Sequence, residues 1–196
     1  MEKSTSISLV GVGGQGILLA SEILARTAML AGHDVKKSEV HGMSQRGGSV
    51  ISQVRFGENV ASPIISDGCS DILVAFEKLE ALRWRCLLKS GGPAIVNQLD
   101  IIPVTVSSGL QPAVEDPDQQ LAALFPDLQL VDAQAMAEEA GNQRTANIVL
   151  TGALARLMQF EVALWKQALE ERLPTRLLEV NLRAFDAGYQ SADAKG

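Results

Sequence analysis

Cysteine, histidine and aromatic residues are scarce in this chain of 196 residues. It has two Cys, two His and one Tyr, and aromatic residues make up 4% of the total. Cys69 and Cys86 form no CxxC pair, and two thiolates are fewer than the set that holds an iron–sulfur cluster. We therefore expect two reduced, mostly buried thiols, and any redox role has to use a metal carried by another chain.

Basic residues are missing from a long stretch of the chain. No Lys or Arg occurs between Lys89 and Arg144, and the acidic residues of that stretch are Asp100, Glu115, Asp116, Asp118, Asp127, Asp132, Glu138 and Glu139. With a net charge of −6 and a pI near 5.0, the chain lacks the broad basic surface of a nucleic-acid-binding protein. The acidic stretch predicts a solvated surface, with docking of a basic partner as the alternative.

Long apolar runs are absent as well. Residues 4–21 are uncharged, but glycines interrupt them, and Glu2 cancels the charge of Lys3, so neither a membrane span nor a signal peptide is predicted. We expect a cytoplasmic protein without a membrane partner. The 46% hydrophobic and 20% charged content is that of an ordinary globular protein. The length predicts a single domain over residues 1–190, followed by a frayed tail at 191–196.

What the chain does have is an alternation of strand-like and helix-like segments. The strands are predicted at 7–10, 34–40, 49–56, 71–76, 93–97, 103–107 and 128–131. The helices are predicted at 17–31, 77–89, 145–160, 162–172 and 175–189, with Trp84 and Trp165 as core or interface residues. This pattern predicts an α/β fold: a single Rossmann-like domain with a mostly parallel sheet flanked by helices and a helical C-terminal segment.

A glycine-rich loop falls between the first predicted strand and the first predicted helix. Gly11, Gly13, Gly14, Gln15 and Gly16 belong to a GxGxxG pattern, which permits a tight turn and lets backbone N–H groups approach an anion. These five residues are the candidate cofactor-binding residues. The alternative is that the glycines only allow close packing of the strand and the helix.

A second polar loop follows the second predicted strand. It contains Glu39, His41, Gly42, Met43, Ser44, Gln45, Arg46, Gly47 and Gly48. Arg46 could bind a carboxylate or phosphate through two hydrogen bonds, and His41 could exchange a proton near neutral pH, so both are candidate catalytic residues. For His41 a purely structural hydrogen bond is the alternative. No metal site is predicted, because no second His lies nearby.

Glu39, or Asp34, could also bind the ribose hydroxyls of a dinucleotide, as in a small NAD(P)-binding Rossmann oxidoreductase. The polar loop after Glu39 does not fit such a site, and the chain has no separate substrate domain. This oxidoreductase remains the main alternative. An interaction module that binds no ligand at the glycine loop is a third hypothesis.

Taken together, the two loops resemble the gamma-type domain of 2-oxoacid:ferredoxin oxidoreductases, and most of all the beta subunit of indolepyruvate:ferredoxin oxidoreductase. The similar segments cover nearly the whole chain. They are GVGGQG (11–16), SEVHGMSQRGGSV (38–50), SPII (62–65), DILVAFEKLEALR (71–83), GNQRTANIVLTGALA (141–155) and EVNLRAFDAGY (179–189).

The resemblance implies a subunit of an enzyme that oxidatively decarboxylates a 2-oxoacid to an acyl-CoA and passes electrons to ferredoxin. It implies that thiamine diphosphate, its Mg and the 4Fe-4S clusters belong to a large partner subunit, and that this chain helps to form the coenzyme A side of the site. On this view the glycine loop and the loop of residues 39–48 face the partner and the acyl acceptor. No residue here is expected to be the nucleophile, the isolated chain is expected to be inactive, and it could form a homodimer when alone.

Overall fold

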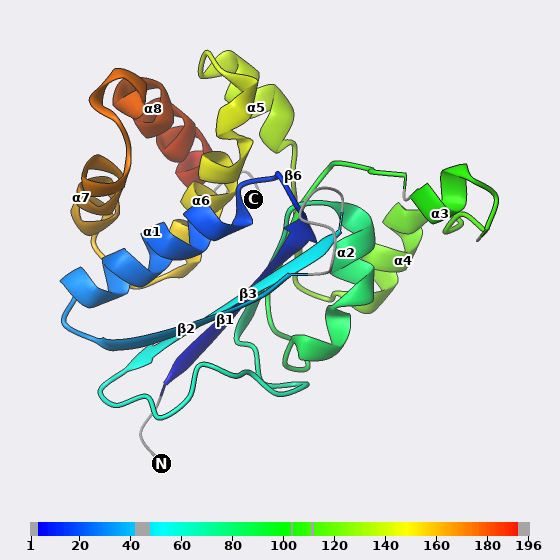
Figure 1. Cartoon of the computed structure of the whole chain (residues 1–196), viewed down its shortest axis with the longest axis horizontal. Helices are drawn as coiled ribbons and strands as arrows, with labels where there is room; N and C mark the ends of the chain where they lie inside the picture. The colour runs from blue at the N-terminus through cyan, green and yellow to red at the C-terminus, as the bar shows by residue number, and fades with distance from the viewer. Residues whose placement is uncertain (1–3, 42–47, 103, 111, 192–196) are drawn as a thin grey trace.

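The computed structural model describes residues 4–41, 48–102, 104–110 and 112–191. A six-stranded sheet runs through the middle of the molecule (Figure 1). Its strands are β1 (Thr5–Val12), β2 (Asp34–His41), β3 (Ser49–Gly57), β4 (Ile72–Ala75), β5 (Ala94–Asn97) and β6 (Leu128–Val131). Helices cover both faces of the sheet, as expected of an α/β fold.

The strand order is β2-β3-β1-β4-β5-β6. β3 runs antiparallel to both of its neighbours, whereas the β1–β4, β4–β5 and β5–β6 pairs are parallel. Among the described strands only β3 is therefore reversed, which confirms the prediction of a mostly parallel sheet. β3 also separates β2 from β1. In the strand order of a dinucleotide-binding Rossmann fold, by contrast, the first two strands are neighbours.

The helices form two groups (Figure 1). One group comprises α1 (Ile17–Leu30), α5 (Ala133–Glu139), α6 (Ala146–Leu157), α7 (Val162–Arg172) and α8 (Thr175–Ser191). The other comprises α2 (Lys78–Arg83), α3 (Val104–Ser107) and α4 (Pro117–Leu124). Short 3₁₀ turns occupy Arg85–Leu87 and Gln143–Thr145.

The hydrophobic core is divided by the sheet because successive residues of a strand point to opposite faces. Leu9 and Val74 belong to the cluster under α1, α6 and α8, whereas Val10 and Leu73 belong to the cluster under α2 and α4. The central strands are buried on both faces, which explains why they are nearly continuous apolar runs in the sequence.

Several predicted elements need correction. The predicted strand at 103–107 is wrong, because Val104–Ser107 is a helical turn and both edges of β5 are already paired with β4 and β6. The predicted helix at 77–89 ends at Arg83, where Trp84 leaves helical geometry. The sequence patterns also missed α4 and α5, which are short and have few buried side chains. α8 continues through Ser191, the first residue of the predicted tail, and residues 192–196 lie outside the described part.

The cysteine prediction is wrong on burial. Cys69 and Cys86 are both exposed, because Cys69 lies in the turn that leads into β4 and Cys86 in the 3₁₀ turn after α2. Trp165 is fully buried, as predicted. Within the described ranges, no helix combines the length and the hydropathy needed to cross a membrane.

Candidate functional site

The connections between the strands diverge at one point of the sheet. From β1 the chain passes through α1 to β2 on one side, and from β3 it crosses to β4 on the other side of β1. In open α/β sheets, ligands bind where the connections diverge in this way, outside the carboxyl ends of the strands. The candidate site is therefore the carboxyl edge between β1 and β4. The glycine loop follows β1 at this edge, and Phe76 and Glu77 follow β4.

The Gln15 side chain folds back from the glycine loop onto this edge. Its Oε1 accepts a hydrogen bond from the Val12 N–H at 2.6 Å, and its Nε2 donates to the Phe76 carbonyl at 3.1 Å. Asn97, at the end of β5, donates to the same carbonyl at 3.0 Å and accepts from the Ala133 N–H at the start of α5. These amides thus fix the relative positions of the segments that follow β1, β4 and β5.

Two of the glycines are needed for close packing. A Cβ on Gly11 would lie 2.5 Å from Gln15 Oε1, and a Cβ on Gly16 would lie 2.5 Å from Asn147 Nδ2. Gly16 also has a φ of 81°, in the left-handed region that favours glycine. Gly14 has a φ of 102° and open space where its Cβ would be. Close packing of the strand and the helix, the alternative to ligand binding, therefore explains Gly11 and Gly16. It does not explain Gly14, which faces open space.

Three N–H groups of the glycine loop are already used within the chain. The Val12 N–H is bound by Gln15, the Gln15 N–H donates to the Val12 carbonyl at 3.2 Å, and the Gly13 N–H donates to the Gly48 carbonyl at 2.9 Å. These three groups are not available to an anion. The Gly13–Gly48 bond also shows that the glycine loop meets the end of the second polar loop.

The second polar loop connects β2 and β3 at the same edge as the glycine loop. In the antiparallel pairs Val12 lies opposite Ser49, and His41 lies opposite Val50. The loop residues Gly42, Met43, Ser44, Gln45, Arg46 and Gly47, and the side chain of His41, lie outside the described part of the chain. The structure therefore brings the described ends of the second polar loop to the edge where the glycine loop lies.

Glu39 is badly placed for the ribose role of the dinucleotide alternative. It lies on β2, the edge strand, and β3 stands between β2 and the glycine loop. Its carboxylate forms an ion pair with Lys37 at 2.6 Å. In a dinucleotide fold the acidic residue ends the strand that lies beside the glycine-loop strand.

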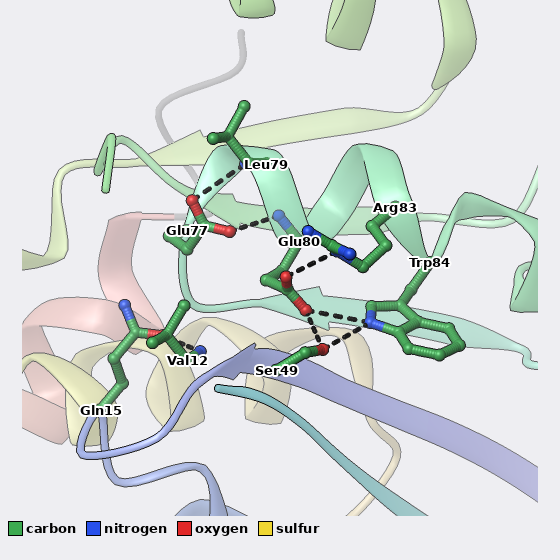
Figure 2. A network of polar contacts seen from close by, with 8 residues as sticks. All are labelled: Val12, Gln15, Ser49, Glu77, Leu79, Glu80, Arg83 and Trp84. Atoms are coloured by element: carbon green, nitrogen blue, oxygen red, sulfur yellow. Dashed lines mark hydrogen bonds and ion pairs between the residues drawn. The ribbon is translucent and has the colours of Figure 1, made fainter. Parts of the chain in front are cut away.

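A buried polar network supports the start of β3 (Figure 2). The Glu80 carboxylate on α2 accepts hydrogen bonds from Ser49 Oγ and from Trp84 Nε1, the latter at 3.0 Å, and pairs with Arg83 at 2.8 Å. Trp84 also donates to Ser49 Oγ at 3.0 Å. α2 thereby fixes the point at which the second polar loop returns to the sheet.

Glu77 is a buried carboxyl group next to this network. It is 1% exposed, and as the N-cap of α2 it accepts hydrogen bonds from the Leu79 N–H, at 3.0 Å, and the Glu80 N–H. Burial raises the pKa of the Glu77 carboxyl to about 7, although those backbone hydrogen bonds act in the opposite direction. The group therefore changes charge near neutral pH at the carboxyl end of β4.

A small polar pocket of about 140 Å³ opens beside the glycine loop. Its polar lining consists mainly of amides and one guanidinium, contributed by Gln15, Asn97, Gln134, Gln143, Arg144 and Asn147. We call it the amide pocket. Gln134 Oε1 is buried there without a hydrogen-bond partner. The pocket can bind a neutral or anionic polar group through hydrogen bonds.

The sequence patterns missed Glu77, Asn97 and the amide pocket. One signal was available, since Glu77 directly follows the predicted strand at 71–76 and Asn97 ends the one at 93–97, positions that place both side chains at the carboxyl edge. In the described ranges, no group of three or more His, Cys, Asp or Glu is placed to hold a metal ion.

Comparison with known proteins gives consistent results. The family model described as "Pyruvate ferredoxin/flavodoxin oxidoreductase" matches residues 6–191. The chain is 42% identical over 195 residues to indolepyruvate oxidoreductase subunit IorB of Pyrococcus horikoshii, covering 97% of this chain and 96% of that protein. It is 30% identical over 189 residues to 2-oxoglutarate synthase subunit KorC of Methanocaldococcus jannaschii, covering 95% and 92%.

A solved structure shows the same fold. The gamma subunit of a keto/oxoacid ferredoxin oxidoreductase from Geobacter sulfurreducens superimposes with a TM-score of 0.71 at 26% identity, covering 97% of this chain and 99% of that one. The similarity extends over the whole domain, including the segments that form the carboxyl edge.

Proposed function

Since the chain belongs to the pyruvate ferredoxin/flavodoxin oxidoreductase family, we propose that it is one subunit of a 2-oxoacid:ferredoxin oxidoreductase. The observation that carries this proposal is the match to subunits of such enzymes over nearly the full length of both chains. The enzyme oxidatively decarboxylates a 2-oxoacid to an acyl-CoA and passes the electrons to ferredoxin. The NAD(P)-binding alternative has no such support, and the placement of Glu39 argues against it.

The oxoacid is indolepyruvate in this proposal. The indolepyruvate relative is 42% identical to the chain, and the 2-oxoglutarate relative is 30% identical. Both relatives are named as subunits, so larger partner subunits are implied. Ferredoxin as the acceptor, a homodimer of the isolated chain and the cytoplasmic location stay predictions.

The chemistry of electron transfer and decarboxylation is assigned to the partner subunit. Two cysteines, both exposed and on separate segments, do not fit an iron–sulfur cluster. Thiamine diphosphate, Mg and 4Fe-4S clusters bound to the partner supply that chemistry, and this chain contributes surface and binding groups.

The chain's own contribution is the carboxyl edge between β1 and β4. Gly11, Gly13, Gly14, Gln15 and Gly16 follow β1 at this edge, and we assign the loop Glu39–Gly48, which returns to the sheet at β3 beside β1, to the same surface. The Gly13–Gly48 hydrogen bond supports a common surface for both loops. We assign coenzyme A and the partner subunit to this surface, with Arg46 binding an anionic group of coenzyme A and His41 as a proton carrier.

The test begins with the chain tagged in its own host and purified anaerobically under mild conditions. We expect a brown complex, much heavier than the 20.9 kDa chain, that contains thiamine diphosphate and reduces ferredoxin with indolepyruvate and coenzyme A. In the same complex, Arg46→Ala should raise the KM for coenzyme A by about tenfold and change the KM for the oxoacid little, because one charge-assisted contact is lost.

Arg176→Ala is the matched control, since Arg176 is an exposed arginine on α8. A colourless monomer or dimer without a partner would count against the subunit assignment, and NAD(P) binding would then be measured. An intact, active complex in which Arg46→Ala leaves both KM values unchanged would remove Arg46 from the coenzyme A site.

A further inference from the structure

A second pocket lies beside the candidate site, in the helical group of α2, α3 and α4. It has a volume of about 430 Å³ and is bounded by α2, residues 100–102, α3 and the segment that leads into α4. Its apolar lining includes Leu79, Leu82, Ile101, Ile102, Val106 and Val114. We call it the apolar pocket. Figure 1 shows these elements side by side, next to the carboxyl ends of the strands.

The mouth of the apolar pocket exposes large hydrophobic side chains. Ile102 is 69% exposed and Val114 is 42% exposed, and the neighbouring Leu110 is 78% exposed. Exposed large apolar side chains in the lining of a hollow, here Ile102 and Val114, are typical of a protein-binding surface.

The edge of the apolar pocket is acidic. Asp100 lines it, and Glu115 and Asp116 directly follow Val114 in the chain and are exposed. Apart from the residues of α2, which include Arg83, the lining of the pocket falls within the stretch between Lys89 and Arg144 that has no basic residue.

Two cations lie near the pocket, and both are ion-paired. Lys78 is buried and shared by two carboxylates, with Nζ 3.1 Å from Asp100 and 2.9 Å from Asp118. Arg83 pairs with the buried Glu80 at 2.8 Å. Lys78 and Arg83 thus face three carboxylates, and with Glu115 and Asp116 in addition the charge beside this apolar pocket stays negative.

We propose that the apolar pocket binds a segment of the larger partner subunit in which apolar side chains are flanked by Lys or Arg. Charge complementarity selects this occupant, because apolar side chains fill the floor while basic ones face Asp100, Glu115 and Asp116. A second copy of this chain would bring its own acidic stretch to the same surface. The proposal rests on the proposed function, since it requires that the chain be a subunit.

The pocket also adjoins the surface already assigned to the partner. α2 starts directly after Glu77 at the carboxyl edge, and its Leu79, Leu82 and Arg83 line the apolar pocket. A partner seated on the carboxyl edge can therefore extend over α2 into the pocket.

The test uses the complex purified from co-expression of the chain with its partner subunit. Mass photometry after dilution gives the dissociation constant of each variant. Ile102→Asp should weaken the complex by about tenfold or more, because it places a charge in an apolar contact. Ile64→Asp is the matched control, since Ile64 is also exposed (58%) but lies in the loop between β3 and β4, away from the pocket. It should weaken the complex less than about twofold.

A second pair of variants tests the charge. Glu115→Lys should weaken the complex and Glu139→Lys, in the same acidic stretch but on α5, should not. Thermal unfolding of each isolated variant checks that the fold is kept, and Glu115→Lys serves if Ile102→Asp is unstable.

Equal dissociation constants for the pocket variants and their controls would overturn this proposal and leave the subunit assignment intact. Failure of the wild-type chain to form any complex would overturn both. Self-association of the isolated chain that Ile102→Asp abolishes would show that a second copy, not the partner, occupies the pocket.

Discussion

At the scale of single residues, Glu77 is the most consequential side chain that the structure adds. It is almost fully buried, caps α2, and stands where β4 ends beside the glycine loop. Its carboxyl keeps a proton up to about pH 7, whereas in the unfolded chain it loses the proton near pH 4.5. Between these two values only the folded state binds the proton, so the wild-type free energy of unfolding falls as pH rises.

We expect to detect this loss of stability by comparing the wild type with Glu77→Gln, whose side chain is neutral at every pH. The free energy of unfolding of the wild type should fall relative to that of the variant by about 3 kcal/mol between about pH 4.5 and pH 7. Above that range the difference should level off. Urea unfolding of both proteins across the range measures it, and a difference that is constant with pH would show that burial does not control this group.

At the scale of elements, α6 and α8 pack with their backbones in direct contact. A Cβ added to Gly152 on α6 would lie 2.1 Å from the Phe185 carbonyl oxygen, and one added to Gly188 on α8 would lie 1.9 Å from the Val149 carbonyl oxygen. Each helix thus has a glycine where the other helix passes. This contact holds the C-terminal helix against the layer that covers the sheet.

Gly188→Ala should therefore destabilise the chain by about 2–4 kcal/mol, because neither backbone can yield without separating the helices. Chemical unfolding monitored by circular dichroism is the measurement. Gln190→Ala, two positions further on the same helix and exposed, should stay within about 0.5 kcal/mol of the wild type. If both variants were equally stable, the close approach of the two helices would be wrong.

At the scale of the whole molecule, one sheet serves two hydrophobic cores. Trp165 lies in the core under α1, α6 and α8, and Trp84 packs against the core under α2 and α4. Both cores use side chains of the same strands, so we expect them to form together. This sharing supports the prediction of a single domain.

Two single-tryptophan variants can test that prediction. In Trp84→Phe only Trp165 reports on unfolding, and in Trp165→Phe only Trp84 does. We expect the fluorescence midpoint in urea to coincide with the circular-dichroism midpoint within each variant, as for one cooperative unit. A fluorescence transition that precedes the loss of secondary structure in either variant would show that its core unfolds separately.

Local patterns in the sequence determined most of the elements. β1 contains the apolar run at 7–10, and β3 contains the alternating residues at 49–56. α1 corresponds to the helical spacing at 17–31. Within a helix or a strand, the apolar side chains recur at regular short intervals along the chain. This spacing can be read directly from the sequence. The two loops with their strand ends were likewise enough to indicate the carboxyl edge and the family.

Only the tertiary structure decided what depends on distant partners. Val104–Ser107 forms a helical turn although its β-branched residues favour a strand, and the preceding strand β5 already pairs with β4 and β6. β3 inserts between β1 and β2, which moves Glu39 away from the glycine loop, and no local pattern specifies that pairing. The exposure of Cys69, the burial of Glu77 and the apolar pocket between α2 and α4 arise from how layers pack, because burial is a property of the whole fold and not of a segment.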